Sequence, residues 1–574
     1  MSGIGGVLSI AKTALFAQQM AIEVTSHNVA NVNTPGYTRQ QLILQANNPT
    51  PVSVGQIGSG VQGQEIMQFY DEFMTLKVNQ KASALNAYDS KQSSMQVIET
   101  LFNETTQEGM SALLGQFWAA WQDLGNNPTG KAERSTLVQR AELLIDQFQS
   151  VYSDLARMES DMGIRLDTAI EDVNSLTERI GDLNVQITSV ADSGRSANDL
   201  RDNRQVLLRE LSDMMDINYF ETSDGSVLVM TTSGHVLVSG CDSWELELSG
   251  GNVYWVGQSG ATLQLTTSDV QEGKLGGWMA IKDDVIPDYE DKMDDIAEAL
   301  IWEVNSQHSQ GMGLDPLTSA TATYAASDAT EEVGTADSGL AFYDKISNGT
   351  FQLYLYDANG ARINQTAISI TAATDTLQAV AADIQAVSGF SSSVNADGKL
   401  TISLNVGEEA AAAGFGFSDD TSNILAALGI NTFFDGYSSG SIDMNSAVSD
   451  DPNNITAGTI DSATGDYSLG NNENALAISD LKLEDVSIGS ETMTIESYYN
   501  SLVGEIGIAA RGYARDFEFT RDMVNQLSQA RDSVSGVSLD EEIANLVKYQ
   551  HAYSAAAKLI QTADEMLQAL LAVK

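Results

Sequence analysis

The chain has 574 residues, and its 29 Lys and Arg residues against 78 Asp and Glu residues give a net charge of −49. This acidity argues against nucleic-acid binding through a basic face and against binding to an anionic membrane, because both partners would be repelled. The single cysteine, Cys241, excludes an intramolecular disulfide and zinc sites that need several cysteines. The apolar share of 43% is that of a globular chain, and the length predicts about three or four domains.

The N-terminal residues contain no basic segment followed by a continuous apolar run, so no cleavable secretory signal peptide is predicted. No stretch approaches 18 uninterrupted apolar residues, which argues against a transmembrane helix. The sequence therefore indicates a protein that is either cytosolic or exported by a route that reads another signal.

The first 30 residues are predicted to form an amphipathic helix, because apolar residues recur at helical spacing along one stripe. The helix is expected to end at Asn33-Thr34-Pro35-Gly36-Tyr37, where asparagine precedes a Pro-Gly turn. A polar stretch that contains proline is expected to continue to about Gly60. The stripe consists of Ile4, Leu8, Ala11, Leu15, Ile22 and Val29.

Residues 58–63, Gly-Ser-Gly-Val-Gln-Gly, match the G-x-G-x-x-G pattern of dinucleotide-binding proteins. That function requires a strand before the glycines and a helix that begins within them. Here a polar stretch precedes the motif, and β-prone residues surround it. We therefore interpret the motif as a glycine-rich turn.

Residues 130–192 carry the most regular pattern in the chain, since apolar residues alternate in steps of three and four from Leu137 to Val190. Two consecutive steps of four, from Met158 to Leu166, form a stutter that locally unwinds a coiled coil. An unbroken helix of this extent would span on the order of 80 Å at 1.5 Å per residue. Such a helix is unusual in a compact enzyme and common in elongated structural proteins.

Strand-rich regions alternate with helices through the rest of the chain. Residues 216–268 show period-two alternation and turn sequences, which predict hairpins. A helix is predicted over 283–307, and residues 340–488 are again strand-rich apart from a helix at 376–387. Helix is predicted once more from 491 to 531.

The last segment, residues 539–574, is predicted to be a heptad helix. Ordering about 35 residues costs roughly 35–70 kcal/mol, whereas burying eight seam residues returns well under about 25 kcal/mol. The isolated helix is therefore not expected to be stable. Our hypothesis is that its partner is the N-terminal stripe, and that both termini are ordered only when packed together or against other subunits. The seam consists of Leu546, Tyr549, Tyr553, Ala556, Ile560, Ala563, Leu567 and Leu570.

The charge is distributed unevenly along the chain. Residues 1–50 hold only Lys12, Arg39 and Glu23, whereas residues 311–510 hold four basic and 27 acidic residues. The end and the middle of the chain are therefore suited to different surroundings.

No catalytic, cofactor or metal site is predicted. His235 and Cys241 lie in a predicted hairpin region without a supporting Asn or Asp motif, and the four histidines lack metal-binding spacing. Asp419-Asp420 and Asp450-Asp451 are interpreted as solvated acidic loops, because no EF-hand loop is present. Carboxylates are too numerous for counting to exclude a glycosidase pair, but no pair is marked out.

The two ends of the chain resemble signatures of the bacterial flagellar axial proteins, the family of rod, hook and hook-associated subunits. The N-terminal signature is Asn28-Val29-Ala30-Asn31-Val32-Asn33-Thr34-Pro35-Gly36-Tyr37-Thr38-Arg39, and the C-terminal one begins Leu539-Asp540-Glu541-Glu542. The internal stretches 198–204, Asn-Asp-Leu-Arg-Asp-Asn-Arg, and 428–436 are similar to the hook-associated members at the hook–filament junction. The resemblance runs from end to end.

Pattern and resemblance together predict a multidomain α+β fold. We expect an elongated molecule with a terminal α-helical coiled-coil or bundle layer and inserted β-rich domains. The expected parts are a terminal helical layer ordered on assembly (1–60 and 536–574), a long-helix bundle (61–215, 272–310 and 489–535), a small β-hairpin region (216–271), a linker or insert (311–340) and an outer, acidic β-rich domain (341–488).

The resemblance implies a structural adaptor without enzymatic activity that joins hook to filament as a homo-oligomeric ring at the hook tip. Its implied partners are the hook protein, the next hook-associated protein on the filament side, and an export chaperone at the C-terminal helix, with no nucleic acid, membrane or cofactor. Unfolded export through the flagellar type III apparatus would place it outside the cell without a cleavable signal. The nearest alternative is another axial protein, such as a hook or distal rod subunit; a secreted enzyme or adhesin with axial-protein ends is less favoured.

The residues expected to make assembly contacts lie in the two terminal segments. Near-neutral ends suit a crowded tube core, where stacked like charges would be costly. The expected assembly residues are Leu8, Leu15, Ile22, Asn28, Asn31, Asn33, Pro35, Gly36, Tyr37, Leu546, Tyr549, Tyr553, Ile560, Leu567 and Leu570.

Overall fold

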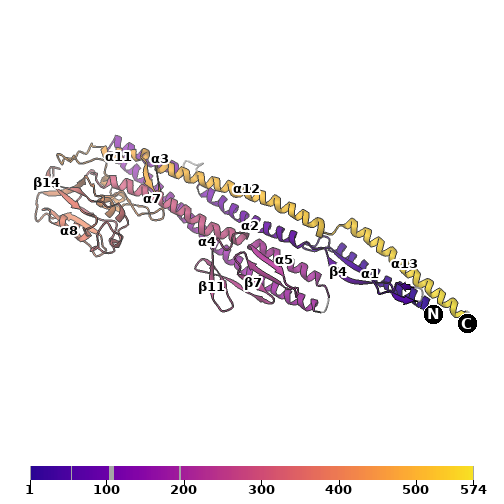
Figure 1. Cartoon of the computed structure of the whole chain (residues 1–574). Helices are drawn as coiled ribbons and strands as arrows, with labels where there is room; N and C mark the ends of the chain where they lie inside the picture. The colour runs from indigo at the N-terminus through magenta and orange to yellow at the C-terminus, as the bar shows by residue number, and fades with distance from the viewer. Residues whose placement is uncertain (1, 53–54, 103–108, 193–194, 573–574) are drawn as a thin grey trace. The chain divides into compact units, whose positions relative to one another are not determined.

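The computed structural model of the protein describes residues 2–52, 55–102, 109–192 and 195–572 (Figure 1). Met1 and Lys574, which end the predicted terminal layer, lie outside the described residues. The chain divides into two compact units built from segments that are distant in sequence. The terminal unit comprises Met1–Ser94, Ser160–Asp284 and Arg511–Lys574, and the inserted unit comprises Met95–Glu159 and Val285–Ala510.

The two ends of the chain pack against each other in the terminal unit. Helix α1 (Ser2–Ala30) lies beside helix α13 (Leu539–Ala572), as Figure 1 shows. This contact confirms the predicted pairing of the two terminal helices, although Ala11 is the only member of the predicted stripe that is buried. Small side chains allow two helix axes to approach closely. The apolar side chains that these two helices bury are all alanines: Ala11, Ala17, Ala21, Ala556 and Ala563.

A two-stranded ribbon packs on α1. Strand β1 (Gln40–Ala46) pairs antiparallel with β4 (Val61–Gln68), and between them β2 (Thr50–Val52) pairs with β3 (Gly55–Ile57). The sequence pattern predicts neither strand β1 nor β4, because most of their residues are at least partly exposed and no period-two apolar alternation results.

The glycine-rich motif lies at the entry to β4, as the interpretation of a turn requires. Gly60 has φ of +105°, a conformation that favours glycine. A Cβ atom at this position would lie 2.1 Å from Thr13 Oγ1 in α1. The glycine therefore allows the ribbon to approach the helix, and the motif does not open a helix as a dinucleotide site would.

Three long helices supply residues to both units. They are α2 (Glu72–Leu101), α4 (Lys131–Ala191) and α12 (Ile495–Ser535). Helix α4 has 61 residues without a break, which confirms the long helix predicted from the apolar repeat. Its length is about 90 Å at 1.5 Å per residue.

The predicted hairpins are present in the terminal unit and cover one face of α4. One sheet contains β5 (Ile217–Glu221), β6 (Val227–Thr231), β7 (Val236–Ser239) and β8 (Asp242–Ser243); the other contains β9 (Glu245–Ser249), β10 (Asn252–Val256) and β11 (Thr262–Leu265). Helices α5 (Asn198–Met214) and α6 (Gly273–Ala280) complete this region.

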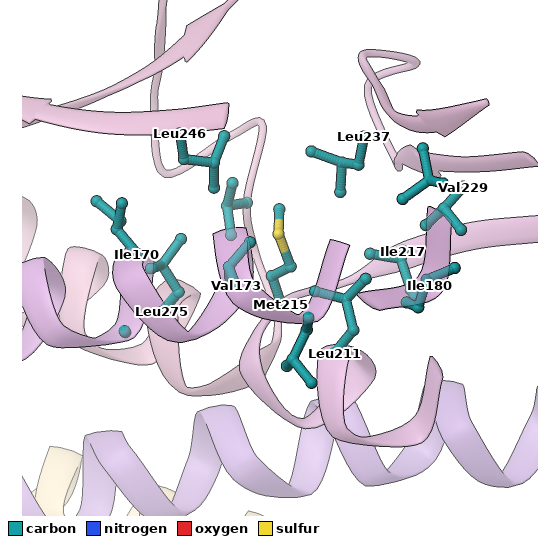
Figure 2. Packing of buried hydrophobic residues seen from close by; sticks show 14 of the residues in the cluster. Ile170, Val173, Ile180, Leu211, Met215, Ile217, Val229, Leu237, Leu246 and Leu275 are labelled. Carbon is teal, nitrogen blue, oxygen red and sulfur yellow. The ribbon is translucent and has the colours of Figure 1, made fainter. Parts of the chain in front are cut away.

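The hydrophobic core of this region joins helix to sheet. Figure 2 shows Ile170, Val173 and Ile180 of α4 in the same cluster as Val229 and Leu237 of the sheet. All five side chains are buried. Part of the apolar face of α4 therefore packs against the β-hairpins and not only against other helices.

The helical part of the inserted unit surrounds an aromatic core. Helix α3 (Met110–Asn126) packs against α11 (Glu473–Asp480), and α7 (Ile286–His308) follows a π-helical turn at Ile281–Val285. Ring contacts with centroids 4.9–6.4 Å apart join Phe117, Trp118, Trp121, Phe433 and Phe434.

The remainder of the inserted unit is β-rich, as predicted. One sheet has the order β14 (Arg362–Ile370), β13 (Gly349–Asp357), β17 (Ala412–Ser418), and another the order β12 (Ser319–Thr321), β16 (Leu400–Leu404), β15 (Phe390–Val394). Helix α8 (Leu377–Gln385) corresponds to the predicted helix at 376–387. The shorter elements are α9 (Ile424–Leu428), α10 (Ser446–Asp450), β18 (Phe434–Asp435), β19 (Asp443–Met444), β20 (Val486–Ile488) and β21 (Glu491–Met493).

Two details of this unit differ from the sequence-based expectations. Residues 311–340, expected as a linker or insert, contribute strand β12, and Leu317 exchanges backbone hydrogen bonds with Phe415. The interpretation of Asp420 as a solvated loop residue was wrong. Its carboxylate is buried and accepts hydrogen bonds from the amides of Ser422 (3.0 Å) and Leu425 (2.8 Å). Backbone amides in turns and at helix starts can thus donate hydrogen bonds to a buried carboxylate in place of a metal ion.

A fully buried histidine lies at the end of α7. His308 Nδ1 donates to the Asn431 carbonyl oxygen at 2.7 Å, and its Nε2 accepts from the Thr456 amide at 3.0 Å. This pattern requires the neutral imidazole. Burial, reinforced by the positive charge of Arg134, lowers the pKa of His308 to about 4.

Acidification is therefore expected to destabilise the inserted unit. Because the folded-state pKa lies below the unfolded value, the contribution of His308 is complete above about pH 6.5 and is lost as the pH falls towards 4, by about 3 kcal/mol. Protection of the Thr456 amide, which donates to His308, should fall between about pH 6.5 and pH 4 in hydrogen exchange corrected for intrinsic rates. His308→Gln should lower protection at pH 7 and flatten the pH dependence; an unchanged slope would contradict this assignment.

Candidate functional site

The turn that follows α1 is held by its own side chains. Asn31 Nδ2 donates to the His27 carbonyl oxygen at 3.1 Å, and Thr34 Oγ1 donates to Asn31 Oδ1 at 3.1 Å. Asn33 and Pro35 are exposed. The asparagines of the predicted signature thus have different roles, since Asn31 orders the turn and Asn33 faces solvent.

The glycine of this turn contacts helix α5. Gly36 has φ of +79°, and a Cβ atom there would lie 2.4 Å from Val206 Cγ2. A larger residue would be strained and would displace the Val206 side chain. The Pro-Gly turn therefore fixes the direction in which the chain leaves α1.

Asn28 connects the turn, the ribbon and α13. Its Nδ2 donates to the Gln40 carbonyl oxygen at 2.8 Å and to Glu542 Oε2 at 2.9 Å. Its Oδ1 accepts from the Gln40 amide at 3.0 Å and from the Tyr37 hydroxyl at 2.8 Å. These four bonds use the full capacity of the amide, so the buried Asn28 side chain is completely satisfied.

Arg39 ties the N-terminal segment to the first turn of α13. Its Nε lies 2.8 Å from Glu542 Oε1, and its Nη1 lies 2.9 Å from Glu541 Oε2. The Arg39 amide also donates to the Ser535 carbonyl oxygen at 3.0 Å, and the guanidinium lies 5.3 Å from the Phe69 ring centroid. The Glu542 side chain is only 3% exposed, so this ion pair is largely withdrawn from water.

The internal stretch 198–204 joins the same site from α5. Asp202 accepts hydrogen bonds from Thr38 Oγ1 and Gln68 Nε2, both at 2.6 Å, and from the Thr38 amide at 3.1 Å. Asp199 Oδ1 accepts from Gln40 Nε2 at 2.8 Å. We call this set the signature cluster: Asn28, Tyr37, Thr38, Arg39, Gln40, Gln68, Asp199, Asp202 and Glu542.

Burial has the largest effect on the pKa values of Asp202 and Tyr37 in the signature cluster, and neighbouring carboxylates add to it. Burial raises the pKa of Asp202 to about 6; the hydrogen bonds from Thr38 oppose this shift, and Asp199 adds to it. Burial and the charges of Asp199, Asp202 and Glu542 also raise the pKa of the Tyr37 phenol. Tyr37 therefore stays a hydrogen-bond donor to Asn28 at any physiological pH.

The link between α5 and the N-terminal segment is expected to weaken as the pH rises. Because the folded-state pKa of Asp202 lies above the unfolded value, its contribution is present near pH 4 and is lost through about pH 6, by up to about 3 kcal/mol. The protection of the Thr38 amide in hydrogen exchange should therefore fall as the pH rises from about 4 to 6. Asp202→Asn should remove this pH dependence. Asp242→Asn, at an exposed aspartate of β8, is the matched control; removal of the pH dependence by that variant as well would refute the assignment.

The sequence-predicted assembly residues fall into two groups in the structure. Asn28, Asn31, Gly36 and Tyr37 belong to the turn and the signature cluster, whereas the apolar residues line the terminal helices. Leu567 and Leu570 are exposed in the single chain, at 38% and 51%. The half-buried ones are Leu8, Leu15, Ile22, Leu546, Tyr549, Tyr553 and Ile560.

Sequence reasoning missed the contacts that join the signatures to one another. Arg39 and Glu542 are 503 positions apart, and no local pattern pairs them. The available signal was charge, since Arg39 is one of two basic residues in a near-neutral segment and Glu541-Glu542 lie in an acidic helix start.

The described ranges contain neither a group of three His, Cys, Asp or Glu side chains suited to a metal nor a helix long and apolar enough to cross a membrane. Cys241 is exposed. The signature cluster offers hydrogen bonds and one ion-pair network. What the arrangement can do chemically is to hold three distant segments of the chain together.

Comparison with known proteins gives matches along the whole chain. The family model of the flagellar basal body rod protein matches residues 8–38, and that of the C-terminal region of the flagellar basal body rod FlgEFG protein matches residues 528–573. The family model of the helical domain of flagellar hook-associated protein FlgK matches residues 95–320. The first model includes Asn28, Tyr37 and Thr38 of the signature cluster, the second includes Glu542, and the third includes Asp199 and Asp202.

Three relatives illustrate the extent of the similarity. Flagellar hook-associated protein 1 of Bacillus subtilis is 25% identical over 571 residues, covering 98% of this chain and 97% of that protein. The Salmonella typhimurium protein of the same name is 25% identical, with both chains covered completely. A solved flagellar hook junction protein from Burkholderia pseudomallei shares the fold, with a TM-score of 0.51, 17% identity and coverage of 80% of this chain and 100% of that one.

The chain is therefore a structural axial protein of the bacterial flagellum, a class whose members associate with other axial components. Its multidomain α+β architecture, with long terminal helices and β-rich inserts, is that of the junction-protein fold. Within the class, it is a homologue of flagellar hook-associated protein 1 along its entire length.

Proposed function

We propose that this protein is the adaptor that joins the flagellar hook to the filament, and that it assembles as a homo-oligomeric ring at the hook tip. The observation that carries the proposal is the exposed apolar surface of the paired terminal helices. Phe16 of α1 is 54% exposed, and Leu559 of α13 is 50% exposed. Burial of a large apolar side chain contributes roughly 1.5–3 kcal/mol, and an apolar surface of this kind is typical of an interaction site.

The paired helices are proposed to form the inner layer of the ring. Their buried side chains are mostly small, so the large ones remain available to neighbouring subunits, to the hook protein on one side and to the next hook-associated protein on the other. The β-rich, acidic residues 341–488 would face solvent. The exposed large apolar residues of α1 and α13 are Val7, Phe16, Met20, Leu539, Ile543, Val547, Leu559, Met566, Leu567, Leu570 and Leu571.

Assembly is proposed to follow export of the unfolded chain through the type III apparatus. The terminal helices would be completely ordered only on incorporation, because one helix pair leaves much of its apolar surface in water. An export chaperone would cover the exposed face of α13 before export. Folding at the growing tip would then supply the assembly free energy and prevent polymerisation inside the cell.

A strain that lacks this protein tests the proposal by electron microscopy. We expect complete hooks, no filaments, and filament subunits released into the medium. Filaments of normal length would contradict the proposal. Truncated hooks or rods would show that the protein acts earlier, as a hook or rod subunit.

A further inference from the structure

A pocket of about 430 Å³ lies next to the signature cluster in the terminal unit, among β4, α5 and β5. One wall comes from the stretch 198–204, whose sequence is similar to that of the hook-associated proteins at the hook–filament junction. Asn198, Arg201, Asp202 and Arg204 of that stretch line the pocket. The stretch thus contributes both to the pocket and to the signature cluster, because Asp202 also binds Thr38 of the N-terminal segment.

The pocket carries more negative than positive charge. Its lining includes two arginines, which both bind Glu221: Arg201 Nη2 lies 3.0 Å from Glu221 Oε1, and Arg204 Nη2 lies 2.6 Å from Glu221 Oε2. The carboxylates of Glu65, Glu72 and Asp202 line it as well. Glu65 and Glu72 are exposed, so both are accessible to a partner.

The rest of the lining is apolar and aromatic. Met67 and Tyr70 are 41% and 39% exposed, and Tyr219 lines the pocket from β5. Glu72 lines the same pocket as Tyr70. Carboxylates beside a methionine and a tyrosine match one kind of ligand, a cationic head on an apolar stem. Lysine and arginine side chains have this form, and arginine also stacks on aromatic rings.

We propose that this pocket binds an arginine or lysine side chain that is flanked by apolar residues and belongs to a different, neighbouring axial protein of the flagellum. This inference rests on the function proposed above. Charge complementarity favours a different chain over a second copy. A second copy has few cations to offer, because each chain holds 29 Lys and Arg residues against 78 Asp and Glu residues. The side chain's stem would lie against Met67 and Tyr70, and its charge would face Glu72 and Glu65.

Photo-cross-linking in assembled flagella tests the identity of the occupant. Benzoylphenylalanine in place of Met67 should cross-link to a different axial protein, at a segment with an arginine or lysine between apolar residues, as identified by mass spectrometry. Leu263, which is 47% exposed on β11 and does not line the pocket, provides the matched control position. Cross-links to a second copy of this chain, or none above that control, would overturn the proposal.

Charge reversal at the pocket mouth tests its contribution to assembly. Glu72→Lys and Glu65→Lys should each lower incorporation at the hook tip at least about tenfold, because a like charge would face the incoming cation. Glu247→Lys, at an exposed position of β9, should incorporate normally. Unchanged incorporation of both pocket variants would refute this inference alone, whereas a wild-type chain absent from the hook tip would refute the proposed function. Circular dichroism of the purified variants separates an assembly defect from misfolding, and normal hydrogen exchange at Thr38 shows an intact signature cluster.

Discussion

Replacement of Glu542 by alanine is expected to release α13 from the N-terminal segment. The side chain is almost completely buried, binds Arg39 at 2.8 Å and accepts a hydrogen bond from Asn28 at 2.9 Å. Removal of one member of a buried ion pair costs roughly 3–5 kcal/mol, and we expect the lower end of this range because Arg39 keeps its pair with the exposed Glu541. Native-state hydrogen exchange of the α13 amides in the full-length protein should show a loss of protection of this size.

The neighbouring glutamate provides a matched control for this variant. The Glu541 side chain is 61% exposed and binds the same arginine at 2.9 Å. Exposed ion pairs contribute at most about 1 kcal/mol, so Glu541→Ala should change α13 protection little. Equal effects of the two alanine variants would show that burial does not set the strength of this contact.

The double variant Leu567→Asp, Leu570→Asp is expected to abolish assembly while leaving the single chain folded. Both leucines are exposed on α13, so their loss removes little intramolecular packing, and exposed substitutions usually change stability by no more than about 0.5 kcal/mol. In the proposed ring these side chains would be buried, and two carboxylates would have to be dehydrated. Electron microscopy of complemented cells should show hooks without filaments.

Leu483 provides the control for introducing a carboxylate at an exposed leucine. This residue is 77% exposed and lies in the inserted unit, outside the terminal helices. Leu483→Asp should support normal filaments. Filaments on cells that carry the double variant would show that this face of α13 is not used in assembly.

Periodic patterns predicted the elements whose signal is local. The repeat of α4 predicted a helix that the structure extends over 61 residues, and the alternation in residues 216–268 predicted the hairpins. The pairing of α1 with α13 followed from an energetic argument, because neither helix buries enough apolar surface alone. In contrast, the ribbon of β1 and β4 is exposed over much of its length, so its sequence carries no alternation.

The role of individual apolar residues could not be predicted from the same patterns. A heptad repeat shows which side chains share a face, but it does not show whether that face is covered by the same chain or by a neighbour. Ala556 and Ala563 of the seam are buried in the single chain, whereas Leu567 and Leu570 are exposed. The structure therefore assigns the alanines to intramolecular packing and leaves the terminal leucines in water.

Long-range polar contacts were the part of the site that sequence reasoning could not find. The signature cluster brings together residues near positions 28–40, 199–202 and 542, which the sequence shows only as parts of separate motifs, and Gln68, which belongs to no motif. Hydrogen bonds between such segments depend on the tertiary fold, for which the sequence has no local signal. The resemblance of three separate stretches to one family was the available indication that they act together.

The central claim is that this protein forms the ring between hook and filament with its terminal helices inside. Cryo-electron tomography of the hook–filament junction, with averaging and an identifying tag on the inserted unit, tests that claim directly. We expect a tagged ring at the hook tip in which α1 and α13 form the inner layer and their exposed apolar side chains contact neighbouring subunits. A tag distributed along the hook, rod or filament, or terminal helices that face solvent on the outside of the ring, would contradict the account.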